Sequence, residues 1–540
     1  MYLFENPVLQ RELLANLRMG RAFLLLLFYL ALLSGVVYLA WPSDRTLDLT
    51  RNPEAAKRLV NLFFLGQYLL ASLMAPTFAA GAITGEKERR SYEMLLATPM
   101  QPGAVVIGKL LASLCHLAIL VFCSLPIVVL CLPLGGISIY EVLAAYLGLI
   151  LSVMVFGTIS LASSSYFRRT AASLVVSYLL ILPLALGAVL VWWALEGTGT
   201  FRFLLAVTVF PALATTVCIL LFVTTSARLL HPPDVGSEGM DVIDLEAESE
   251  QAVGLVIRRD QFPDRLFAPA KRADFLEDGM NPVYEKEMRS EIFSQGTLML
   301  RLVIQVSMGL AIPLMACYLF IWPSYAPWYI SYVLLFNMLV GPVFSAGGIT
   351  NERERQTLDL LLTTTLSPWT ILWGKLVSGL RVSSVLTLFL LWPVLLACVM
   401  IDAFWSNLPT MAGYVVIVLL TCLTTSVTAL LCSVLADRTA VSLVLTYVVI
   451  VTLFTAPLAG VFFADTFFPD APATRWIEWA GASSPFAAVM SLPLDCDSGS
   501  DAARPANLPL FVSAGVFLIV YNLALLASMA WLLNARWRVS

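Results

Sequence analysis

The chain has 540 residues, of which 59% are hydrophobic and only 13% are charged, and its mean hydropathy is +0.85. A soluble protein usually has about 25% charged residues, so this composition excludes a large soluble core and is typical of an integral membrane protein. The formal net charge of −4 gives no indication of nucleic-acid binding. The nine cysteines show neither a disulfide framework nor the spacing of metal ligands.

Twelve membrane-spanning helices are predicted from stretches without Asp, Glu, Lys or Arg. A helix needs about 20 apolar residues to cross a bilayer. The stretches are residues 22–43, 59–85, 110–140, 142–167, 170–195, 203–227, 302–351, 382–401, 403–436, 439–464 and 505–535. The stretch 302–351 is long enough for two spans, and Pro323 and Pro327 predict a turn in its middle.

Each half of the chain begins with Asn-Pro and a charged segment, NPVLQREL from Asn6 and NPVYEKEM from Asn281. Proline suits the first turn of a helix, and a helix with one charged and one apolar face is expected to lie in the membrane interface. The charged residues that mark these two interfacial helices are Arg11, Glu12, Lys286 and Glu287.

A charged passage occurs twice, between the second and third spans of each half. Residues 83–110 read ITGEKERRSYEMLLATPMQPGAVVIGKL, residues 349–376 read ITNERERQTLDLLLTTTLSPWTILWGKL, and twelve of the 28 positions are identical. The identical pairs include Glu86/Glu352, Glu88/Glu354, Arg89/Arg355, Leu95/Leu361, Leu96/Leu362, Pro102/Pro368, Gly108/Gly374 and Lys109/Lys375. Unpaired charges are costly inside lipid, so both passages are expected at the cytoplasmic surface.

A third correspondence supports a duplication. RTAASLVVSY from Arg169 and RTAVSLVLTY from Arg438 both lie between the fourth and fifth spans of their halves. We therefore predict an all-α membrane fold with two tandem six-span repeats, residues 1–228 and 281–540, related by an axis along the membrane normal. Residues 229–280, with 12 acidic and five basic residues, predict a cytoplasmic linker without a packed core.

The outer loops differ between the repeats. The longer extracytoplasmic segment, residues 465–507, holds apolar pieces too short to span, for which we expect short or re-entrant helices. Lys and Arg concentrate on the cytoplasmic side of membrane proteins. With both termini cytoplasmic, the inner segments carry 25 of the 32 Lys and Arg residues, which predicts a multi-pass protein of the inner or plasma membrane in that orientation.

The pattern I-T-x-E-x-E-R, followed by L-L-x-T, P and G-K, resembles the permeases of type 2 ABC exporters, and the resemblance covers essentially the whole chain, twice. It implies that interfacial helices (residues 6–20 and 281–296) and coupling helices (residues 84–102 and 350–368) rest on a separate ABC ATPase, present in two copies. ATP and Mg are then bound by that partner. The two halves are fused here, which leaves open whether one chain forms the complete permease.

The chain lacks a complete G-x-x-x-x-G-K-[ST], the loop that cradles nucleotide phosphates. Residues 103–110, GAVVIGKL, have Leu110 in place of the Ser or Thr, and residues 369–376, WTILWGKL, also lack the first glycine. It is therefore predicted to be a transport subunit rather than an enzyme, with no cofactor or metal of its own. Alternatives are an ATP-driven mechanical complex without cargo, a secondary transporter and an intramembrane hydrolase. A secondary transporter usually needs ionisable residues near the midplane of its spans, and a hydrolase needs a nucleophile and a base there; the sequence shows neither.

The charged passages have two interpretations. Glu86–Arg89 and Glu352–Arg355 pairs, one helical turn apart, would stabilise a solvated helix face, whereas the agreement between the repeats favours contact with the ATPase. The residues expected to dock the ATPase are Glu86, Glu88, Arg89, Leu95 and Leu96 with their counterparts Glu352, Glu354, Arg355, Leu361 and Leu362.

Other residues in or beside the spans are candidates for further roles. Lys109 and Lys375 are expected to extend to lipid head groups. Arg381 lies within a span and is a candidate for the transport pathway. Pro76 and Pro342 favour helix kinks just before the charged passages and are candidates for gating.

Overall fold

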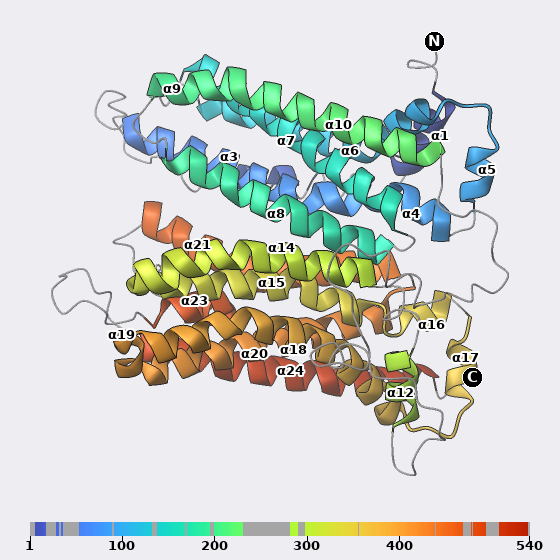
Figure 1. The fold of residues 1–540 in the computed structure, drawn as a ribbon, viewed down its shortest axis with the longest axis vertical. Helices are drawn as coiled ribbons and strands as arrows, with labels where there is room; N and C mark the ends of the chain where they lie inside the picture. Colours follow the sequence, from blue (N-terminus) through green and yellow to red (C-terminus); the bar gives the residue numbers. More distant parts are fainter. Residues whose placement is uncertain are drawn as a thin grey trace. The chain divides into compact units, whose positions relative to one another are not determined.

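The computed structural model describes residues 6–17, 27, 29–31, 34–35, 53–88, 91–131, 138–167, 170–194, 199–230, 281–289, 297–354, 356–437, 439–467, 477, 479–492 and 507–537. These residues are helical apart from short turns, and they contain no strand. The chain divides into two compact units, Met1–Val242 and Ile243–Ser540, each a bundle of long helices (Figure 1). The boundary falls within the predicted linker, which lies outside the described residues.

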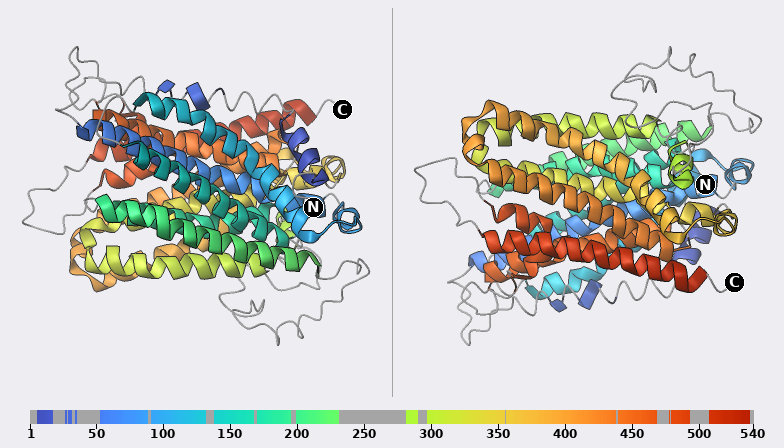
Figure 2. Two further views of the ribbon diagram at one scale, coloured as in Figure 1. Left: turned by 90° about the horizontal axis from the view of Figure 1, so that it is seen from above. Right: turned by 90° about the horizontal axis from the view of Figure 1, so that it is seen from below.

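The first unit is built around α7, which packs against α3, α6, α8 and α10. The long helices of each unit run along one another (Figure 2). The elements of this unit are α1 (Pro7–Leu17), α3 (Pro53–Ala79), α4 (Gly81–Glu88), α5 (Tyr92–Leu96), α6 (Pro102–Cys131), α7 (Ile139–Tyr166), α8 (Thr170–Ala194), α9 (Gly199–Leu204), the π-helix η2 (Leu205–Val209) and α10 (Phe210–Leu230).

The second unit is built in the same way around α20, which packs against α15, α18, α21 and α24. Its elements are α12 (Pro282–Arg289), α14 (Thr297–Met315), η4 (Ala316–Ile321), η5 (Pro323–Tyr325), α15 (Ala326–Ala346), α16 (Thr350–Glu354), α17 (Leu358–Leu362), α18 (Pro368–Met400), α19 (Asp402–Ser406), α20 (Leu408–Leu435), α21 (Thr439–Phe467), η6 (Gly481–Ser483), α23 (Pro485–Met490) and α24 (Leu508–Trp537).

Eleven helices in the described part of the chain are long and apolar enough to cross a membrane. The remaining predicted span, residues 22–43, lies mostly outside the described residues. The predicted break in 302–351 is confirmed, because η4 ends at Ile321 and the turn Pro323–Tyr325 precedes α15. The surface of α10 exposes Leu213, Ile219 and Leu220, a large apolar area that suits contact with lipid.

Residues 465–507 contain short helical pieces in the part that the structure describes, as predicted for this segment. In its described part, η6 and α23 pack against α21, α20 and α24. Pro485, Ala488 and Val489 of α23 are buried. The backbone N–H of Asn507 donates to the carbonyl of Ser491 at 2.9 Å, which fixes the start of α24 against this segment.

Candidate functional site

An asparagine ties the first turn of each interfacial helix to the long helix that follows the charged passage. Asn6 Oδ1 accepts a hydrogen bond from the Val8 amide at 3.1 Å and so caps α1. Asn6 Nδ2 donates to the Ala104 carbonyl of α6 at 2.6 Å. Asn281 caps α12 in the same way and donates to the Thr370 carbonyl of α18 at 2.9 Å. The repeated Asn-Pro therefore sets both the start and the position of the helix.

The repeated glycine of the Gly-Lys pair lies directly beneath this asparagine. A Cβ atom at Gly108 would come within 2.8 Å of Asn6 Nδ2. At Gly374 it would lie 3.0 Å from both Asn281 Nδ2 and the Tyr284 backbone nitrogen. Glycine is needed at both positions because the interfacial helix approaches the long helix so closely.

In the second unit the lysine of the pair is buried at the centre of a group of four charged side chains, of which Lys286 is 56% exposed. Lys375 Nζ lies 2.7 Å from Glu287 Oε1 and 3.2 Å from Glu352 Oε1, and the Lys375 side chain is only 2% exposed. Lys286 Nζ lies 2.8 Å from the same Glu352 oxygen. We call Lys286, Glu287, Glu352 and Lys375 the second charge quartet. It joins α12, α16 and α18.

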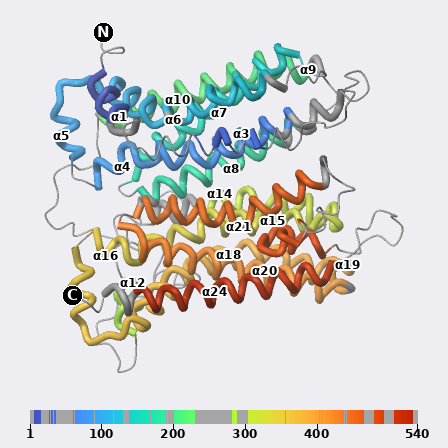
Figure 3. Tube along the Cα trace, turned by 180° about the vertical axis from the view of Figure 1, so that it is seen from behind, coloured from blue at the N-terminus to red at the C-terminus, as the bar shows by residue number. Residues whose placement is uncertain are grey.

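The first unit contains a matching group. Lys109 Nζ lies 3.4 Å from Glu12 Oε1 and 3.3 Å from Glu86 Oε1, and the Lys109 side chain is 3% exposed. The charge of Arg11, the counterpart of Lys286, also attracts the Glu86 carboxylate. Arg11, Glu12, Glu86 and Lys109 form the first charge quartet, where α1, α4 and α6 meet (Figure 3). Its contacts are longer, and Glu86 is 22% exposed against 8% for Glu352.

The prediction that Lys109 and Lys375 extend to lipid head groups is wrong. Both side chains are buried and bind carboxylates from the interfacial helix and from α4 or α16. The sequence placed each lysine at the start of a span but did not show that two other elements fold over it. The alternative pairs, Glu86–Arg89 and Glu352–Arg355, involve two arginines outside the described residues.

The second repeated glutamate holds a different helix. Glu88 Oε1 accepts hydrogen bonds from the Thr170 amide at 2.7 Å and from the Thr170 hydroxyl at 3.0 Å. Glu354 accepts from the Thr439 amide at 2.7 Å and from its hydroxyl at 2.9 Å. Because free amides at a helix start favour a carboxylate, these glutamates fix the first turns of α8 and α21. Within each unit, the charged passage therefore contacts the passage that begins with Arg-Thr-Ala.

One serine in each unit completes the arrangement. Ser433 Oγ of α20 accepts hydrogen bonds from the amides of Ile349 and Thr350, at 2.9 and 3.0 Å. Ser164 of α7 accepts from the matching amides of α4 at 3.0 and 2.9 Å. The sequence contains an indication that these serines correspond, because each lies five residues before the repeated Arg-Thr-Ala.

Beyond each quartet, the chain runs through a short exposed helix, α5 or α17, at the same end of its unit as the interfacial helix (Figure 1). Neither helix has a buried residue. Met94 is 75% exposed and its counterpart Leu360 is 69% exposed. Exposed acidic residues, Glu93 and Asp359, precede them. The predicted docking leucines Leu95, Leu96, Leu361 and Leu362 are half-buried on these helices.

The remaining candidate residues lie near the same end of their units. Pro76 and Pro342 are buried inside α3 and α15, and these helices end three and four residues later, at Ala79 and Ala346. Arg381 Nη1 of α18 donates to Tyr284 Oη of α12 at 2.7 Å. Roles for these residues in a pathway or gate stay predictions.

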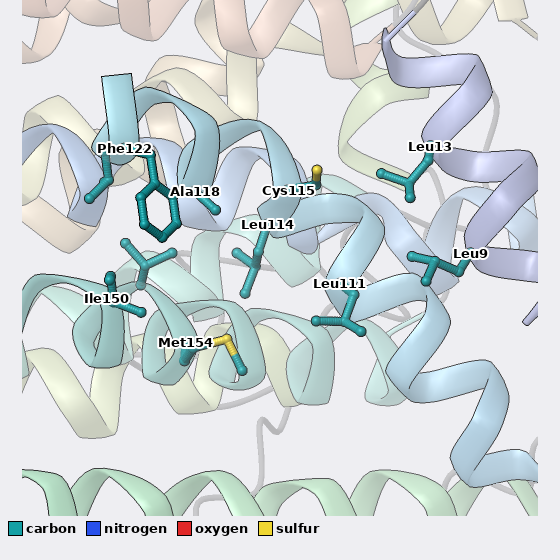
Figure 4. Close-up of a pocket in the computed structure, with 11 residues that line it drawn as sticks. Leu9, Leu13, Leu111, Leu114, Cys115, Ala118, Phe122, Ile150 and Met154 are labelled. Carbon is teal, nitrogen blue, oxygen red and sulfur yellow. The ribbon is translucent and has the colours of Figure 1, made fainter. Parts of the chain in front are cut away.

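The positions of Arg381 and Tyr284 differ in character between the repeats. Their counterparts in the first unit are Cys115 and Leu9, which help to line an apolar pocket of about 310 Å³ between α1, α6 and α7 (Figure 4). Where the second unit has a polar bridge between the interfacial helix and the long helix, the first unit therefore has an apolar space. Within the described ranges, no cluster of His, Cys, Asp and Glu fits a metal ion.

This fold and site define a multi-pass membrane protein with two tandem repeats, each with an interfacial helix anchored to a charged passage. Family models described as ABC-2 family transporter protein match residues 7–200 and residues 318–533. The chain therefore belongs to the ABC-2 family of transporters, as an internally duplicated permease. This family implies an ABC ATPase partner and a membrane subunit without its own ATPase motif. Neither the curated proteins nor the solved structures gave a match.

Proposed function

We propose that the chain is the permease of an ABC exporter, and that its ATPase docks on α5 and α17. The observation that carries the proposal is the exposed acidic-apolar pair at the same place in both repeats, Glu93–Met94 and Asp359–Leu360. A large apolar side chain that protrudes outside the spans is stabilised when a partner covers it, and a neighbouring acidic residue favours a partner surface with a basic rim.

The four repeated glutamates, which the sequence analysis assigned to docking, are not part of the docking surface that we propose. Glu86 and Glu352 bind lysines of their own unit, and Glu88 and Glu354 bind helix starts. Their carboxylates therefore stabilise contacts within the permease. We assign docking to the four residues of the two exposed pairs, with the half-buried leucines behind them.

Two repeats with one exposed helix each favour two ATPase copies on one chain. The excess of Lys and Arg in the same segments supports a cytoplasmic position for both exposed helices and for both termini. Export, rather than import, rests on the resemblance to type 2 exporters. Movement of cargo by the complex reconstituted with its ATPase separates this function from that of a mechanical complex without cargo.

The test is the double variant Met94→Glu/Leu360→Glu in the full chain. Each apolar side chain contributes about 1.5–3 kcal/mol when it is fully buried, so each of the two sites should bind its ATPase copy at least about tenfold more weakly. The measurement is the amount of P-loop ATPase that co-purifies with the permease in lipid nanodiscs. Gln101→Glu/Thr365→Glu, which adds two charges at exposed positions of the same loops, is the matched control. Undiminished ATPase in the first variant would contradict this docking surface.

A further inference from the structure

We propose that each charge quartet is a rigid joint that transmits movement of the docking helix to the interfacial helix and to the following span. Lys109 and Lys375 are then positioning residues at the centres of the joints. The inference rests on the proposed docking of an ATPase at α5 and α17. It adds a route by which a displacement of these exposed helices reaches the membrane-embedded bundle.

The route begins at the residue just before the docking helix. Thr357, which precedes α17, donates its amide to the Glu352 carbonyl at 2.9 Å, and its hydroxyl donates to the Glu352 carboxylate. The same carboxylate binds Lys375, and Lys375 binds Glu287 of α12. An unbroken series of polar contacts therefore connects the docking helix with both the long helix α18 and the interfacial helix α12.

The first unit repeats the route with the same residue types. Ser91 donates its amide to the Glu86 carbonyl at 3.0 Å, and its hydroxyl donates to the Glu86 carboxylate. Glu86 binds Lys109, which in turn binds Glu12 of α1. A direct side-chain link from the docking helix to the quartet is thus kept in both repeats, although serine replaces threonine.

Burial makes these joints stiff. The lysine at each centre is shielded from water. When one of its contacts breaks, water therefore cannot readily take the place of the lost partner. A movement of the docking helix is therefore expected to carry the quartet with it instead of separating its members. The second quartet has the shorter contacts and the less exposed glutamate, so it should be the stiffer of the two.

The decisive variant is Thr357→Val, which removes the side-chain link but leaves all ion pairs of the quartet in place. Thr364→Val is its matched control, because the Thr364 hydroxyl donates to the Leu361 carbonyl at the other end of α17. The measurements are the ATPase that co-purifies with the full chain in nanodiscs and the stimulation of its ATP hydrolysis by the permease. We expect Thr357→Val to retain the ATPase and to lower the stimulation about tenfold, the scale of one hydrogen bond to a charged group.

Two results would overturn the joint. If Thr357→Val stimulates hydrolysis as strongly as Thr364→Val, the link transmits nothing, while docking stands. If Thr357→Val loses the ATPase together with the stimulation, the residue acts in docking and not in transmission. Failure of the docking proposal itself is recognised separately, by full ATPase binding to the Met94→Glu/Leu360→Glu variant.

Inversion of the whole second quartet provides a second test. Lys286→Glu/Glu287→Lys/Glu352→Lys/Lys375→Glu restores complementary charges, and the Thr357 hydroxyl can then accept from the new lysine. We expect this variant to recover most of the stimulation that Glu352→Lys alone removes. An inverted quartet that stimulates no better than Glu352→Lys would show that the sign of the charge at position 352 matters to the partner, which would refute an internal joint.

Discussion

Replacing the central lysine of the second quartet should destabilise the protein more than the same change in the first. Lys375→Met removes the ammonium that both Glu287 and Glu352 bind, and these side chains are only 14% and 8% exposed. Removing one partner of a buried ion pair costs about 3–5 kcal/mol. Lys109→Met leaves carboxylates that water reaches more easily, since Glu12 is 34% and Glu86 22% exposed. The loss there should be about 1.5–3 kcal/mol, the scale of hydrogen bonds to charged groups.

Thermal unfolding of the full chain in nanodiscs can measure this difference. A thiol-reactive fluorophore reports unfolding of the second unit through its buried Cys422 and Cys432. At roughly 2 °C per kcal/mol, Lys375→Met should lower the midpoint by about 6–10 °C. The matched control is Lys375→Met/Glu287→Gln/Glu352→Gln, which removes the buried charges together and should recover most of the loss.

Three outcomes would refute this reasoning. Unfolding of Lys375→Met at the wild-type temperature would mean that the ion pairs add nothing to stability. A larger fall in midpoint for Lys109→Met than for Lys375→Met would contradict the ranking by burial. A triple variant no more stable than Lys375→Met would show that the lysine acts through its packing and not through its charge.

Two smaller changes test the contacts around the quartets. Gly374→Ala places a Cβ atom 3.0 Å from the Tyr284 backbone nitrogen, whereas the three atoms nearest to a Cβ at Gly108 all belong to the Asn6 side chain. A side chain moves more easily than backbone, so unfolding assays should show a larger loss of stability for Gly374→Ala, about 1–3 kcal/mol. Equal losses would contradict this difference. Ser433→Ala removes the acceptor of two buried amides and should cost about 1–3 kcal/mol. Hydrogen exchange at Ile349 and Thr350 should then accelerate, and unchanged exchange would show that the serine is dispensable.

The sequence predicted the class of fold because lipid imposes a simple rule on it. Charge-free stretches of about 20 residues indicate spans, and repeated passages indicate a duplication. The turn at Pro323–Tyr325 and the interfacial helix starts at Pro7 and Pro282 follow from the local chemistry of proline. These features depend on residues that are close together in the chain, so a single sequence carries enough information to predict them.

The partners of the charges depend on contacts across the chain, and the sequence analysis did not find them. It required the glutamates to avoid lipid, but it did not show that Lys109 lies beneath Glu12, 97 residues away. One indication was present: both quartets keep the same signs of charge, and Lys109 and Lys375 follow Glu86 and Glu352 at the same separation of 23 positions. The exposed pairs Glu93–Met94 and Asp359–Leu360 were missed because they are similar and not identical.

The anchoring asparagine constrains the order in which the protein is made. Asn6 leaves the ribosome 98 residues before Ala104, the residue whose carbonyl it binds. At about 5–20 residues per second, roughly 5–20 s of synthesis separate the two. The first interfacial helix lacks this hydrogen bond until the start of α6 has been synthesised. The bond can then form before Asn281 has left the ribosome. The bond of Asn281 forms after Thr370, 89 residues later, has been synthesised. Each repeat can therefore form its anchoring bond independently of the other repeat.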